Sequence, residues 1–149
     1  MAGGGGFTAS GPTLATSQVG VEACFLCAGR FGVFAEYSHW FTSGTTSGYN
    51  PSDMVHQADL GGGGLRIQGR GSVRPFIDVG VVGGRDTHWQ GPGGALGGVV
   101  VGGGVRIPFR EHWYIRPQVR AYGLSPHTIE GMSPHWAVSG LIGIGYSWK

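Results

Sequence analysis

The stretch HWAVSGLIGIGYSW, residues 135–148, decides the fold. Its residues alternate between two sets of different chemistry. Small or more polar residues separate the members of an apolar set that has aromatics at both ends: Trp136, Val138, Gly140, Ile142, Ile144, Tyr146 and Trp148. A period of two places alternate side chains on opposite faces of an extended chain. The stretch therefore predicts a β-strand with one apolar face.

The same alternation recurs along the whole chain, and helical periodicity is nearly absent. It predicts about eight strands, with a bulge near 55–60, over residues 2–10, 16–25, 31–42, 55–68, 73–84, 96–108, 113–124 and 135–148. Short connections at 26–30, 69–72 and 109–112 alternate with long ones at 43–54, 85–95 and 125–134. Short turns at one end and long loops at the other are typical of an up-and-down transmembrane barrel. We expect one all-β antiparallel barrel domain over residues 1–149, with both termini beside the short turns.

The composition supports curved strands over other glycine-rich structures. The 32 glycines are mixed with branched and aromatic residues and lack the Gly-X-Y period of collagen. No run approaches the ~20 apolar residues that a membrane helix needs. The net charge is +2 and the basic residues are scattered singly, so no nucleic-acid partner is expected.

The face opposite the apolar one carries the charged residues of the strands. We expect them to line a narrow lumen, where burial forces opposite charges to pair. The predicted lumen charge network comprises Glu22, Glu36, Arg66, Arg74, Asp78, Arg106, Arg116 and Arg120. Paired in this way, they would plug the interior.

Aromatic residues of the apolar face fall at two heights. One set lies beside the short turns or the C-terminus: Phe25, Phe31, Phe109, Trp113, Tyr146 and Trp148. The other set lies toward the opposite strand ends: Tyr37, Phe41 and Trp136. Two aromatic girdles around an aliphatic band are typical of a bilayer-facing surface. The pattern therefore predicts that lipid contacts the apolar face.

The chain resembles the small eight-stranded outer-membrane barrels, the OmpA/OmpX-like group. The most specific feature is the last strand, which ends on Tyr146 and Trp148, although Lys149 follows where the family usually stops on an aromatic. The resemblance implies a bacterial outer-membrane location and recognition of this strand by the barrel-assembly machinery. Residues 1–6 lack the features of a signal peptide, so we expect the numbering to describe a chain from which it is already removed.

Cys24 and Cys27 flank the first short turn. A local disulfide is the expectation, with free thiols or a redox or metal site as alternatives. A zinc site would need a second ligand pair, and none is evident.

Other candidate chemistry is sparse. Ser38-His39, Ser133-Pro134-His135, Glu130 and Asp86 match no catalytic spacing, and no Gly-Lys-Ser/Thr follows the glycine runs. We expect no catalytic, cofactor-binding or metal site.

The favoured function is therefore a non-enzymatic barrel with structural or surface-contact roles, carried by long loops such as 43–54. A lipid-modifying barrel enzyme and a narrow channel remain as alternatives, because fold alone does not settle function.

Overall fold

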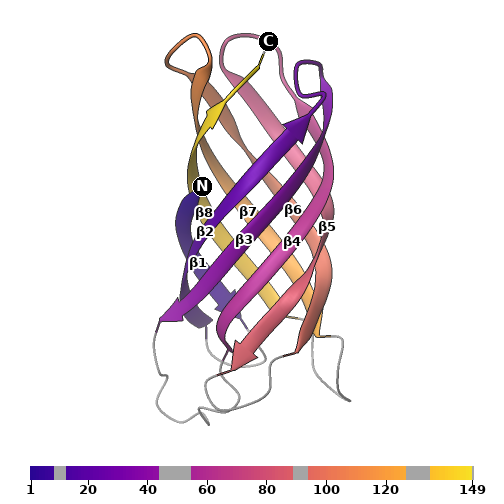
Figure 1. Ribbon diagram of the computed structural model, residues 1–149, viewed down its shortest axis with the longest axis vertical. Helices are drawn as coiled ribbons and strands as arrows, with labels where there is room; N and C mark the ends of the chain where they lie inside the picture. Colours follow the sequence, from indigo (N-terminus) through magenta and orange to yellow (C-terminus); the bar gives the residue numbers. More distant parts are fainter. Residues whose placement is uncertain (9–12, 44–54, 89–93, 127–134, 149) are drawn as a thin grey trace.

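The computed structural model describes residues 1–8, 13–43, 55–88, 94–126 and 135–148. These residues form eight antiparallel strands and no helix (Figure 1). The strands are β1 (Ala2–Thr8), β2 (Thr13–Phe25), β3 (Phe31–Ser43), β4 (Val55–Gln68), β5 (Arg74–His88), β6 (Ala95–Pro108), β7 (Trp113–Pro126) and β8 (His135–Tyr146). No helix among the described residues is long and apolar enough to span a membrane.

Each strand pairs with the next along the chain, and β8 pairs with β1 to close the barrel. The predicted all-β, up-and-down antiparallel fold is therefore confirmed. The strand positions agree closely with the alternation of the sequence, and the register of β4 against β5 shifts between Val55 and Gln57, where a bulge was expected. The largest difference is β5, which continues to His88 instead of ending near residue 84.

Three short turns lie at one end of the barrel, together with the C-terminus (Figure 1). Leu26 and Gly71 adopt positive φ angles of 59° and 106° in the β2–β3 and β4–β5 turns, as tight turns often require. The expectation for the N-terminus was wrong. Met1 lies partway along the wall, where its carbonyl accepts a hydrogen bond from the Gly20 amide at 2.8 Å.

The interior is filled by side chains of two kinds. The half toward the long connections holds a buried apolar cluster that includes Trp40, Leu60, Val100, Tyr122 and Leu124. The rings of Trp40 and Tyr122 meet edge to face with centroids 5.1 Å apart. The half toward the short turns holds charged side chains instead.

The outer wall has the opposite character. Of the described residues, twenty-six large hydrophobics are exposed and only twelve hydrophobics are buried. The exposed ones include Val21, Leu65, Ile77, Val79 and Ile144, each on the outward side of its strand. The barrel thus carries more large apolar side chains outside than inside.

Candidate functional site

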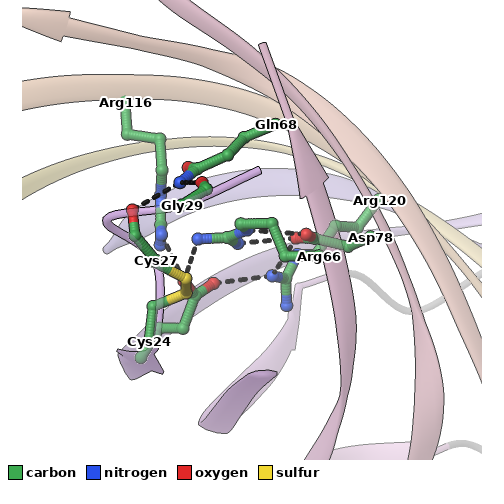
Figure 2. The surroundings of a disulfide bond; sticks show 9 residues. Cys24, Cys27, Gly29, Arg66, Gln68, Asp78, Arg116 and Arg120 are labelled. Atoms are coloured by element: carbon green, nitrogen blue, oxygen red, sulfur yellow. Dashed lines mark hydrogen bonds and ion pairs between the residues drawn. A yellow bond between two sulfur atoms is a disulfide. The ribbon is translucent and has the colours of Figure 1, made fainter. Parts of the chain in front are cut away.

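A buried ion-pair network lies in the half of the barrel nearest the short turns. Figure 2 shows Arg66, Asp78 and Arg120 of this network beside the disulfide. Arg66 of β4 and Asp78 of β5 stand directly opposite each other in the register. Arg66 donates two hydrogen bonds to the Asp78 carboxylate, from Nε to Oδ1 and from Nη2 to Oδ2, both 2.7 Å long. This fork geometry is the strongest form of arginine–carboxylate pairing.

Arg120 of β7 joins this pair to the other side of the barrel. Its Nη2 donates to Glu22 Oε2 at 2.7 Å and to Asp78 Oδ2 at 3.1 Å, and its Nη1 pairs with Glu36. Glu22 and Glu36 are direct cross-strand partners of β2 and β3, an arrangement that like charges alone would destabilise. Arg120 removes that repulsion by bridging the two carboxylates.

A glycine on the strand between them lets Arg120 reach Asp78 along the inner face of the barrel. The register runs from Asp78 through Gly102 of β6 to Arg120, so Gly102 stands between the two charged residues. A Cβ at Gly102 would lie 2.8 Å from Arg120 Cγ. The absence of a side chain at this position therefore makes room for the arginine.

The network is closed by two more contacts to Glu22. Arg66 Nη1 lies 2.9 Å from Glu22 Oε1, and Arg116 also pairs with that oxygen. Three carboxylates and three guanidinium groups are thus brought together, and none of the six side chains is more than 6% exposed. The charges of the plug balance, as burial requires.

Two phenylalanines pack against this network. The guanidinium carbon of Arg66 lies 4.3 Å from the centroid of the Phe76 ring, and that of Arg120 lies 5.2 Å from the Phe34 ring. Arginine stacks well on aromatic faces because its charge is delocalised and weakly hydrated. The two rings therefore cover guanidinium groups inside the barrel.

Two predicted members of the network lie outside it. Arg74 donates from Nε to the carbonyl of Gly71 at 3.1 Å, and Arg106 stacks over the Tyr114 ring at 4.0 Å. Both occupy inward positions of their strands but stand close to the short-turn end. The alternation of the sequence correctly predicts that both side chains face inward. Their positions along the barrel axis, close to the short turns, place them at its mouth.

The cysteine pair lies beside the network. Cys24 and Cys27 form a disulfide with a Cα–Cα distance of 5.8 Å. Gln68 of β4 donates from Nε2 to the carbonyl of Gly29 at 2.6 Å and to that of Cys27, which ties the disulfide-closed turn to the neighbouring hairpin (Figure 2). Sequence reasoning missed Gln68, and its only signal was an inward position at a strand end.

Outside the barrel, the predicted aromatic residues all point away from the interior. The exposed set is Phe25, Phe31, Tyr37, Phe41, Phe109, Trp113, Trp136, Tyr146 and Trp148. Near the C-terminus three of them form a chain of edge-to-face contacts. Ring centroids are 5.3 Å apart from Trp113 to Tyr146 and 5.5 Å apart from Tyr146 to Trp148.

A second polar group lies on the outer wall. Asp59 of β4 accepts a hydrogen bond from Tyr37 Oη at 2.5 Å and contacts His39 Nδ1 at 2.7 Å. The neighbouring Ser38 points into the barrel, where its Oγ accepts a hydrogen bond from Trp40 Nε1 at 2.9 Å. The wall therefore separates the Ser38-His39 pair that the sequence suggested.

Among the remaining candidate residues, Asp86 is the one whose side chain the structure describes. Asp86 is buried and accepts a hydrogen bond from the Gly94 amide at 2.6 Å. Ser133, Glu130 and the 44–54 connection lie outside the described residues, as does the His135 side chain. No group of three or more potential metal-ligating side chains occurs in the described part of the chain.

Comparison with models of known protein families, with curated proteins and with solved structures finds no significant match.

Proposed function

We propose that this chain is an integral bacterial outer-membrane protein of the OmpA/OmpX-like kind, with a closed lumen and a structural or surface-contact role. The observation that carries the proposal is the excess of large apolar side chains on the outer wall. Among the described residues, twenty-two exposed large hydrophobics lie on the strands, against twelve buried hydrophobics. Water-soluble monomers rarely expose apolar patches larger than a few hundred Å².

The position of the aromatic residues supports a bilayer as the medium around the wall. Phe25, Phe31 and Trp113 lie beside short turns, and Trp136 lies at the other end of its strand. Aliphatic residues such as Val79 and Val119 lie between them. Amphipathic rings favour the headgroup level, whereas aliphatic side chains favour the hydrocarbon.

The proposed orientation follows from the connections. In outer-membrane barrels short turns face the periplasm and long loops face outward. The last strand, β8, carries the outward-facing Tyr146 and ends the barrel beside β1. We propose that the barrel-assembly machinery recognises this strand and that the long connections meet the cell's surroundings.

A closed interior separates this proposal from a channel. The neutral network of three acids and three arginines occupies the short-turn half of the lumen, and the apolar cluster occupies the other half. In planar bilayers we expect no stable conductance at neutral pH. Stable openings would contradict the closed lumen and favour the narrow channel.

The membrane proposal has a direct biochemical test. The purified full chain should require detergent to stay monodisperse, and the unboiled barrel should migrate faster on a gel than the boiled chain. A monodisperse protein without detergent and without this heat-dependent shift would show that the apolar wall faces something other than lipid.

Lipid modification is a second candidate function, favoured by the Tyr37–Asp59–His39 group. Asp59 engages Nδ1 of His39, which leaves Nε2 in the arrangement that general bases use. Labelled lipid A or phospholipid should remain unchanged if the barrel is non-enzymatic. Turnover that His39→Gln abolishes, but that the control His112→Gln at the opposite end retains, would establish the enzymatic alternative.

A further inference from the structure

A groove opens on the short-turn end of the barrel, between the β2–β3 and β4–β5 turns. Its volume is about 520 Å³, and its lining includes Arg30, Arg70, Ile67, Pro75 and Ile77. Two exposed arginines from different turns therefore border one hollow whose floor is apolar. This combination suits an amphiphile with a negatively charged head.

The two arginines of the groove carry positive charges that no carboxylate of the described residues neutralises. Neither Arg30 nor Arg70 forms an ion pair with another described residue. In the three short turns and the first residue of β5, four arginines stand against one acid: Arg30, Arg70, Arg74 and Arg110 against Glu111. The buried network is neutral by itself, so this end of the barrel is electropositive.

The apolar floor of the groove continues the outer wall. Ile67 and Ile77 are direct cross-strand partners in β4 and β5, and they are 50% and 62% exposed. Farther from the turns, the next outward pair on the same two strands is Leu65 and Val79. An acyl chain that leaves the groove would therefore meet a continuous aliphatic strip.

The groove is held in shape by the disulfide-closed turn. The Gln68 amide donates to the Arg30 carbonyl at 2.9 Å, and the Gln68 side chain donates to the carbonyls of Cys27 and Gly29. The Gly69 amide donates to the Pro75 carbonyl at 2.7 Å. These bonds set the β2–β3 turn against the β4–β5 turn, and a preorganised site loses less entropy on binding.

We propose that this groove binds the headgroup of an anionic glycerophospholipid. Arg30 and Arg70 would donate to the phosphate, since guanidinium groups pair well with its oxygens, and an acyl chain would lie over Ile67 and Ile77. This inference rests on the proposed membrane location, which places the short turns at the periplasmic leaflet. Basic residues at a bilayer surface favour anionic lipids over zwitterionic ones.

Native mass spectrometry of the detergent-solubilised full chain tests the site. With added phosphatidylglycerol we expect bound lipid at concentrations where phosphatidylcholine is not retained. The variant Arg30→Gln/Arg70→Gln should bind phosphatidylglycerol roughly ten- to thirtyfold more weakly. Its matched control, Arg85→Gln/Arg110→Gln, loses the same charge outside the groove and should bind as the wild type does.

Two further controls distinguish a failure of the groove proposal from a failure of the membrane proposal. Excess inorganic phosphate should leave the lipid bound, and displacement would show that the site takes free phosphate instead. Equal retention of the two lipids by a wild-type barrel with heat-dependent gel migration would overturn the groove alone. Absence of that migration in the wild type would overturn the membrane proposal itself.

Discussion

The two halves of the interior fill the same barrel by different physics. Toward the long connections, Trp40, Tyr122 and Leu124 pack as an apolar core does. Toward the short turns, Arg66, Asp78 and their partners form a neutral ionic plug. The apolar half is a sum of many small contacts, so each side chain contributes in proportion to its buried surface. The ionic half is neutral only as a set, so the loss of one member leaves its partners buried and unpaired.

The same strands build both halves. β7 contributes Arg116 and Arg120 to the ionic plug and Tyr122 and Leu124 to the apolar cluster, all at alternate positions. The change from charged to apolar side chains therefore occurs between Arg120 and Tyr122, which are consecutive inward-facing residues of β7. Both sides of that step belong to one continuous strand, and their side-chain chemistry distinguishes them.

The largest effect should come from breaking the ionic half at its centre. Arg120→Ala leaves Glu22, Glu36 and Asp78 short of a shared partner, and should lower the free energy of unfolding by about 3–5 kcal/mol. Urea unfolding followed by tryptophan fluorescence measures this. Arg110→Ala, in an exposed turn, is the control, with an expected change below about 0.5 kcal/mol. Equal effects of the two variants would contradict the central role of Arg120.

Breaking the apolar half should cost somewhat less. Leu124→Ala removes a side chain that is 2% exposed and should destabilise the barrel by about 2–4 kcal/mol through lost burial and a residual cavity. Because no charge is unpaired, added salt should leave this loss unchanged. The measurement is the same urea titration at two ionic strengths. A salt-dependent loss would contradict the distinction between an apolar and an ionic half.

Gly102 tests how closely the plug is packed. Gly102→Ala should destabilise the barrel by about 1–2 kcal/mol, because the new methyl group meets the Arg120 side chain. Gly97→Ala on the same strand is the matched control, since a Cβ there meets nothing within 4 Å. We expect little change for the control in urea unfolding. Similar losses at both sites would point to strand propensity instead of packing.

The smallest effect should come from turning part of the ionic half into an apolar one. Arg66→Met/Asp78→Leu removes one positive and one negative charge together, so the remaining two acids and two arginines still balance. The double variant should unfold within about 1 kcal/mol of the wild type, whereas each single variant should lose about 3 kcal/mol or more. A double-mutant cycle in urea measures this coupling, and additive losses would refute it.

Most of the fold could be predicted from the sequence because the alternation of side chains repeats the geometry of a strand. Most of the eight strands follow from it, as does the bulge near Val55. The end of β5 could not be predicted this way. Its last residues, Gly83–His88, contain glycines and polar side chains on both faces, so no apolar period marks them.

The sequence predicts that charged residues of both signs form the candidate site, but it identifies only some of the individual residues correctly. Alternation gives the face of a side chain and says nothing of its height or of how far it reaches. Arg74 and Arg106 share the inward face with Arg120, yet their side chains stay near the barrel mouth. The Asp59–His39 contact joins two strands and the Gln68 bonds join a strand to a turn, so both depend on a register that is fixed only when the barrel closes.

Tryptophan quenching by brominated phospholipids tests the central claim most directly, because the barrel holds tryptophans on both surfaces. Two variants, each with one tryptophan left and the others changed to phenylalanine, should be reconstituted in vesicles of lipids brominated on the acyl chain. Trp113 is 44% exposed on the outer wall and Trp40 is 3% exposed inside. We predict strong quenching of Trp113 and little quenching of Trp40. Strong quenching of Trp40 with none of Trp113 would contradict the assignment of lipid to the outer wall.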